Sequence, residues 1–203
     1  MKKLCILAAL AATCGFASAT TINSSIQGTG ALDGNSAYSW GIPVSLAAGQ
    51  TITSASLTFT DIKLTAANSS GKGILYSDLI KSTTTGTHTY TDNDVAGDYF
   101  VSHVASANLV SLGSQIFGSV GTMLSWTVTF NSTQLAALNA FAVGGIFDIG
   151  FDPDCHYNVG CISFTYGTTS NKPAPDAATT VYALGLVLLG LEAARRKLAL
   201  AKK

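Results

Sequence analysis

Ser125-Trp126-Thr127-Val128-Thr129-Phe130 alternates large apolar residues with small polar ones. This period of two predicts a β-strand with its tryptophan, valine and phenylalanine in a core and its serine and threonines in solvent. The surrounding region, residues 20–171, is rich in Thr, Ser, Gly and Ala and contains no Glu. Such a composition favours strands over helices.

A second extended stretch, residues 51–64, changes phase along its length. Leu57 and Phe59 belong to one alternation, whereas Ile62 and Leu64 belong to the other. A β-bulge near Asp61 would bring all four side chains to the same face of one strand, so we predict a bulge there.

Two alternating apolar triplets flank residues 152–160 and predict an antiparallel hairpin closed by that long loop. The triplets are Phe147, Ile149 and Phe151 before the loop and Ile162, Phe164 and Tyr166 after it. Elsewhere, Gly28-Thr29-Gly30 predicts a turn. Weaker strand candidates lie at residues 37–44, 73–79, 85–90 and 99–104.

One short helix is predicted after Phe130. Ser132 or Thr133 can cap its first turn, and one face then carries Leu135, Leu138 and Phe141. Several short strands, turn signals and one helix within about 150 residues predict an all-β fold. The expected architecture of residues 20–171 is a single jelly-roll-like β-sandwich ectodomain.

The formal net charge of the chain is +0, but its segments differ in sign. Residues 20–171 carry three lysines, no arginine and nine aspartates, while both termini are basic. Because so acidic a body cannot neutralise a row of phosphates, nucleic-acid binding is excluded.

The N-terminus has the layout of a secretory signal peptide. Lys2 and Lys3 precede an apolar run, and Ala17-Ser18-Ala19 supplies small residues before a cleavage site. We predict a signal peptide over residues 1–19 that is removed after its last alanine. The alternative is a lipoprotein signal that retains Cys14, but the three residues before that cysteine make a poor lipidation box.

Residues 177–194 form an apolar stretch in which Glu192 is the only charge. As a helix rising about 1.5 Å per residue, the stretch would be roughly 27 Å long, just enough to cross a hydrocarbon core of about 30 Å. The tail at 195–203 is basic, so the positive-inside tendency keeps it in the cytoplasm. We predict a transmembrane helix at 177–194 after a linker and sorting motif at 172–176, with residues 20–171 outside.

Several features follow one another in the tail: Pro175-Asp176, small residues, an apolar stretch with Gly185 and Gly190, and the cluster Arg195-Arg196-Lys197. This order resembles the C-terminal sorting signals of exosortase-dependent bacterial proteins, and is most similar to the VPDSG-CTERM type, a relative of PEP-CTERM. Only the proline and aspartate match, because alanine stands where the pattern prefers Val, Ser and Gly. The resemblance implies export by the Sec machinery, recognition by a membrane-embedded exosortase, cleavage near the motif and delivery to the envelope or its exopolysaccharide.

Two cysteines, Cys155 and Cys161, remain after removal of the signal peptide. Because thiols oxidise in an exported protein, we predict a disulfide between them. A metal site that adds His156 is the alternative, but three ligands from one loop make a thin site. Residues 150–158 also resemble a stretch that recurs near the end of the sandwich domains of PEP-CTERM-type surface proteins, which implies shared architecture and no particular activity.

Two acidic groups offer the oxygen ligands that Ca²⁺ prefers. Asp148 and Asp152 are on the opposite strand face from the neighbouring phenylalanines, which would put a site on the outer surface. Neither group has EF-hand spacing, and aspartate is common in solvated turns. We therefore predict no cofactor, with Ca²⁺ as the one cation that these residues would suit. The first group is Asp92, Asp94 and Asp98, and the second is Asp152 and Asp154 with Asp148 beside them.

No motif names a reaction: the sequence has no Gly-x-Ser-x-Gly elbow, no His-Glu-x-x-His helix and no phosphate-binding glycine loop. Any triad would need His88, His103 or His156 to meet a serine and an aspartate through the fold. Four aromatic residues could form a platform for sugar rings or pack in the core. They are Tyr38, Trp40, Tyr157 and Tyr166.

We therefore expect a non-enzymatic structural or interaction protein of the cell envelope or exopolysaccharide matrix. A surface-displayed binding module, dependent on carbohydrate or Ca²⁺, is the alternative. A surface hydrolase is the third interpretation.

Overall fold

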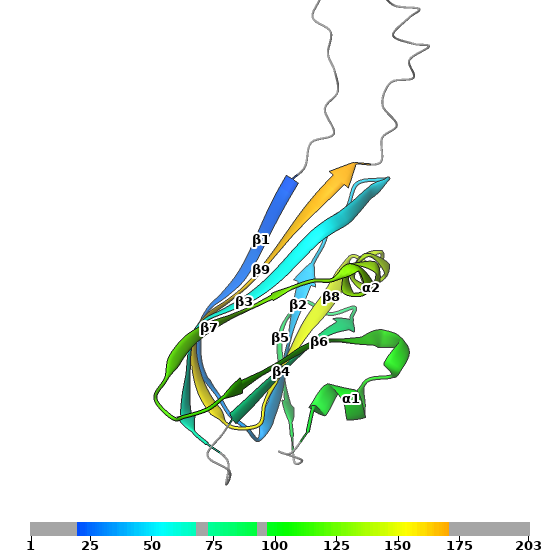
Figure 1. Ribbon diagram of the computed structural model, residues 1–203. Helices are drawn as coiled ribbons and strands as arrows, with labels where there is room; N and C mark the ends of the chain where they lie inside the picture. The colour runs from blue at the N-terminus through cyan, green and yellow to red at the C-terminus, as the bar shows by residue number, and fades with distance from the viewer. Residues whose placement is uncertain (1–19, 68–72, 93–96, 171–203) are drawn as a thin grey trace, which may run out of the picture. The chain divides into compact units, whose positions relative to one another are not determined.

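The computed structural model describes residues 20–67, 73–92 and 97–170. One compact unit spans Ala19–Ser170. It contains two antiparallel sheets packed as a sandwich, together with two short helices (Figure 1). The β-sandwich predicted from the alternating sequence is confirmed.

The strands divide into a four-stranded and a five-stranded sheet. The four-stranded sheet has the order β1 (Thr20–Leu32), β9 (His156–Ser170), β3 (Gln50–Ala66) and β7 (Met123–Thr129). The five-stranded sheet has the order β5 (Gly86–Thr91), β2 (Ser36–Pro43), β8 (Ile146–Pro153), β4 (Gly73–Lys81) and β6 (Leu109–Phe117). The helices are α1 (Tyr99–His103) and α2 (Ser132–Ala142), and Ser106–Asn108 forms one 3₁₀ turn.

The space between the sheets is filled by aromatic and branched side chains. The ring of Phe164 on β9 lies 5.3 Å from that of Phe147 on β8 and 5.7 Å from that of Phe130, measured between centroids. Val128 and Phe130 are buried and Trp126 packs against the same core, whereas Thr127 and Thr129 are exposed. The face assignment made for residues 125–130 is therefore confirmed.

The predicted bulge in β3 is also confirmed. The register between β3 and β7 shifts between Phe59 and Ile62, and Asp61 has a φ of 56°. A left-handed residue between the two alternations lets both reach the core, since Phe59, Ile62 and Leu64 are all completely buried.

The hairpin predicted around residues 152–160 is wrong. β8 and β9 belong to different sheets, and the chain crosses between the sheets at Asp154 and Cys155. Gly34 permits this crossing, because a Cβ there would lie 2.8 Å from the backbone nitrogen of Cys155. Alternation identifies which face of a strand is apolar but not its hydrogen-bonded partner, and these two apolar faces meet across the core instead.

Two strands, β1 and β6, had no counterpart among the predicted elements. Gly28-Thr29-Gly30 is an irregularity within β1 rather than a turn, because the register against β9 shifts between Gln27 and Gly30. Gly30 has a φ of 67°, which glycine adopts without strain. The strands expected near 37–44, 73–79 and 85–90 correspond to β2, β4 and β5.

Helix α2 lies where it was predicted, but its cap is one residue earlier. Asn131 accepts a hydrogen bond from the Gln134 backbone, and the Gln134 side chain accepts one from the Asn131 backbone, which completes a capping box. Leu138 and Phe141 are buried and Leu135 packs against the core, as the pattern indicated.

Candidate functional site: buried carboxyl groups beneath helix α1

Helix α1 covers part of the outer face of the five-stranded sheet. Phe100 is buried with Ala37 of β2 and Ile80 of β4 in a small cluster separate from the main core. The helix can approach because β8 has a glycine at this point: a Cβ on Gly150 would lie 2.8 Å from the Phe100 ring. A face that strand alternation assigned to solvent is therefore covered.

The prediction of a strand at residues 99–104 is wrong for a local reason. Asp98 caps the helix by accepting a hydrogen bond from the Phe100 backbone nitrogen at 3.1 Å. The Tyr99 backbone nitrogen donates to Oδ2 of Asp152 at 2.8 Å, which ties the helix to β8. Aromatic and β-branched residues favour strands, but here the cap and the contact with Ile80 decide the conformation.

The same contacts bring together carboxyl groups from three elements. Asp78 on β4 pairs with Gly150 across the β4–β8 ladder, and Asp152 on β8 pairs with Tyr76, so both aspartates are on the outer face. Both have a relative exposure of 0 %. Asp98 at the start of α1 is partly exposed and completes the cluster, which we call the α1 carboxyl cluster: Asp78, Asp98 and Asp152.

No hydrogen-bond donor among the described residues reaches either carboxyl oxygen of Asp78 or Oδ1 of Asp152. Burial raises the pKa of Asp78 to about 8, and the adjoining Asp98 carboxyl adds to the rise. Burial likewise raises the pKa of Asp152 to about 7, although the Tyr99 N–H bond acts in the opposite direction. Of the two lysines that the structure describes, Lys63 is on the other sheet and Lys81 is on the opposite face of β4 from Asp78.

The structure brings some of the predicted acidic ligands together and leaves others apart. Asp98 and Asp152 come together, and Asp92 at the end of β5 and Asp154 both act on the Asp152 carboxyl through their charge. Asp154 accepts a hydrogen bond from the Ile74 backbone nitrogen, so it joins the sheet crossing to β4. Burial raises the pKa of Asp154 as well. Asp94 lies outside the described residues.

Asp78 was missed because it is not part of an acidic sequence cluster. Its one signal is its position in β4, where a lone aspartate stands among Leu75, Leu79 and Ile80. A carboxyl group inside an apolar strand requires a proton, a donor or a cation. The expectation of an outer-surface site at Asp148 and Asp152 needs correction too, since both residues are buried.

Within the described ranges, no three histidine, cysteine, aspartate or glutamate side chains converge on a single point suited to a metal ion. In that part of the chain there is also no helix long and apolar enough to cross a membrane. The predicted signal peptide and transmembrane segment lie outside the described residues. So do the sorting residues Pro175, Asp176, Arg195, Arg196 and Lys197.

The predicted disulfide between Cys155 and Cys161 is wrong, since no disulfide joins them. Cys155 immediately precedes β9 and Cys161 is within it, so six residues of extended chain separate the two. At about 3.3 Å per residue this is roughly 20 Å, whereas a disulfide needs α-carbons about 4.4–6.8 Å apart.

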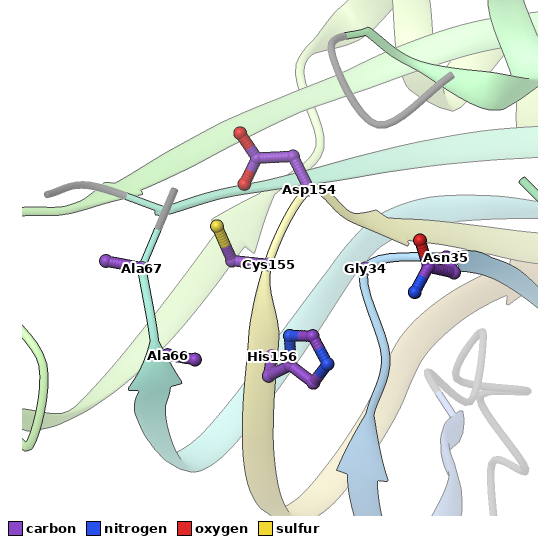
Figure 2. Close-up of a pocket in the computed structure, with 7 residues that line it drawn as sticks. All are labelled: Gly34, Asn35, Ala66, Ala67, Asp154, Cys155 and His156. Carbon is purple, nitrogen blue, oxygen red and sulfur yellow. The ribbon is translucent and has the colours of Figure 1, made fainter. Parts of the chain in front are cut away.

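Cys155 and His156 line a small pocket together with Gly34, Asn35, Ala66, Ala67 and Asp154 (Figure 2). They do not form a nucleophile–base pair. Figure 2 shows the Cys155 sulfur toward the Asp154 carboxylate, with which it hydrogen-bonds, and the His156 ring toward Asn35. His156 instead lies 3.4 Å from Oδ1 of Asp33.

Among the other candidate residues, His103 and Asp148 have structural contacts, whereas Nε2 of His88 is buried without a hydrogen-bond partner from the described residues. His103 contacts the Tyr99 carbonyl through Nδ1 at 2.8 Å, and Ser39 donates to Asp148 at 2.9 Å. The aromatic residues considered as a sugar platform are not exposed together, because they pack in or against the main core. These are Tyr38, Trp40, Tyr157 and Tyr166.

The strand pairing defines the protein as an antiparallel β-sandwich. No protein-family model matches the chain, and no curated protein matches it. Among solved structures, a chain from the structure of maize chlorotic mottle virus is similar at 13% identity and a TM-score of 0.24, covering 75% of this chain and 94% of that one. Values this low support no conclusion, so the fold assignment depends on the strand pairing alone.

Proposed function

We propose that this protein is an exported structural or interaction protein of the cell envelope or exopolysaccharide matrix, displayed as a stable sandwich. One observation carries the proposal: the compact unit Ala19–Ser170 coincides with the interval that the sequence leaves between a signal peptide and a sorting tail. Thr20 pairs with Thr168, so the sandwich begins and ends on neighbouring strands. A single tail after β9 is therefore a suitable attachment for the whole unit.

The proposed architecture is a jelly roll with one added strand. The chain passes between the sheets from β1 to β2, β2 to β3 and β3 to β4, and again from β6 to β7, β7 to β8 and β8 to β9. This produces two four-stranded orders, β1-β9-β3-β7 and β2-β8-β4-β6, with β5 added beside β2. Jelly rolls consist of eight strands in two such sheets.

A structural or interaction role is preferred to catalysis because a serine, a histidine and a cysteine that could serve as catalytic groups each contact an aspartate instead. Ser39 bonds to Asp148, His156 is beside Asp33, and the Cys155 thiol bonds to a carboxylate. Partners in this proposal are the Sec machinery and an exosortase during export, the membrane through residues 177–194, and exopolysaccharide afterwards.

The test is the mass and C-terminal sequence of the mature protein recovered from native cells. The proposal expects a chain that begins at Thr20 and ends near Asp176. Asp176→Ala should retain the tail, whereas Asp33→Ala, at an exposed aspartate of the sandwich, should be processed normally. Recovery of a chain that runs to Lys203 would overturn exosortase processing and leave a plain membrane anchor.

A further inference from the structure

The carboxyl groups of Asp78 and Asp98 are close enough to act on each other through their charge, and no lysine of the described residues lies between them on this face of the sheet. Asp78 is completely buried and pairs with Gly150, the residue on which Phe100 of α1 packs, while Asp98 caps the same helix. No hydrogen-bond partner among the described residues reaches either oxygen of Asp78. Two carboxylates at close range repel each other, and burial strengthens the repulsion. A proton or a cation must therefore lie between them when α1 is docked.

The surroundings of this pair favour a cation with a preference for oxygen. Asp152, completely buried, has one carboxyl oxygen without a hydrogen-bond partner among the described residues. Asp154 and Asp92 add negative potential at Asp152. Because Asp98 is only partly buried, an ion can approach from that side.

We propose that Asp78 and Asp98 bind Ca²⁺, and that the bound ion fastens helix α1 to the five-stranded sheet. Ca²⁺ accepts six to eight oxygen ligands in flexible geometry, so water and backbone carbonyl groups can complete a site that has only two carboxylates. Mg²⁺ requires near-ideal octahedral geometry and gives up water reluctantly, so it suits the site less well. With few charged ligands the affinity is in the weak range, with a Kd of about 10⁻⁴–10⁻³ M.

The ion would act on the docking of α1 rather than on the main core. Asp98 caps the helix, and Asp78 and Asp152 belong to the two strands beneath it. An ion shared by Asp78 and Asp98 removes the repulsion that otherwise separates the helix from β4. This proposal does not depend on export or tail processing, so either can fail without the other.

Thermal unfolding of the full-length protein in mild detergent provides the test, first with a chelator and then with CaCl₂ raised to about 10 mM, well above the expected Kd. The melting temperature should rise and saturate with Ca²⁺. An equal concentration of MgCl₂ should have a smaller effect. Asp78→Asn should weaken the apparent affinity for Ca²⁺ about tenfold or more, since one of two charged ligands is lost.

Asp61→Asn is the matched control. Asp61 is an exposed aspartate on the other sheet, and asparagine tolerates its left-handed backbone, so this variant should respond to Ca²⁺ like the wild type. If Asp78→Asn does not fold, Asp98→Asn replaces it, because asparagine caps a helix as well as aspartate does. Two results would overturn the proposal. One is a melting temperature that is the same in chelator and in Ca²⁺. The other is a response to Ca²⁺ that is unchanged in Asp78→Asn or Asp98→Asn.

Discussion

The five-stranded sheet has buried side chains on both of its faces, and the buried side chains of the two faces differ in chemistry. On β8 the inner face carries Phe147, Ile149 and Phe151, and the outer face carries Asp148, Gly150 and Asp152. All six positions are buried. The alternation in this strand therefore separates two kinds of burial rather than burial from exposure.

The two faces are stabilised by different means. The inner face stabilises the folded state because apolar area is removed from water and rings such as Phe147 and Phe164 contact each other. The outer face buries Asp78 and Asp152, which lowers stability unless a proton or an ion neutralises them. Conditions such as pH and divalent ions should thus act on the outer face and leave the inner face unaffected.

The largest expected effect comes from removing an inner-face ring. Phe147→Ala should destabilise the sandwich by about 3–5 kcal/mol, because a completely buried ring is lost and its neighbours cannot fill the cavity. Urea unfolding followed by tryptophan fluorescence measures this loss. Thr129→Ser, at an exposed position, should stay within about 0.5 kcal/mol of the wild type. An equal effect of both changes would mean that the inner face is not the main source of stability.

The outer face should respond more moderately to a change in packing. Gly150→Ala places a methyl group 2.8 Å from Ile80 and from the Phe100 ring, so overpacking should cost about 1–3 kcal/mol. Phe100→Ala combined with Gly150→Ala should cost less than the sum of the two single changes, because the ring that clashes is gone. Additive losses in urea unfolding would contradict the close contact between α1 and β8.

The residues of the inner face could largely be predicted from the alternation of large apolar residues in the sequence. In β3 the apolar residues are large enough to reveal both the alternation and the change of phase at Asp61. In β1 the only large apolar residues before the irregularity are Ile22 and Ile26, so no comparable pattern marks that strand. Pairing partners were not predictable, as β8 and β9 demonstrate, because face alternation carries no information about which strand lies beside which.

The outer face could be predicted only in part. Asp98 and Asp152 were singled out as acidic residues, but Asp78 joins them only because β4 pairs with β8 and α1 folds across both strands. The sequence places Asp78 and Asp98 far apart, and helix α1 itself is made of residues that favour strands. A local pattern cannot report a cluster that tertiary packing assembles from three elements.

The smallest expected effect is a pH dependence of the melting temperature, which the buried carboxyl groups of the outer face should cause and the inner face should not. With divalent ions removed by a chelator, the melting temperature should fall as pH rises from about 4 to about 8. Asp78 and Asp152 have folded-state pKa values of about 8 and about 7, both above the ordinary value of 3.8. The folded state therefore holds these protons more tightly than the unfolded chain does. Their stabilising contribution is complete below the ordinary pKa and is lost as pH rises through the folded-state values.

Asp78→Asn should flatten the upper part of this pH dependence, because the amide does not titrate, while Phe147→Ala should lower the melting temperature by a similar amount at every pH. Circular dichroism melts from pH 4 to pH 8 give both comparisons. Asp61→Asn, at an exposed aspartate of the four-stranded sheet, should leave the slope unchanged. A wild-type melting temperature that rises over this interval would show that the carboxyl groups beneath α1 are stabilised as anions. The two faces would then not differ in the way that their burial implies.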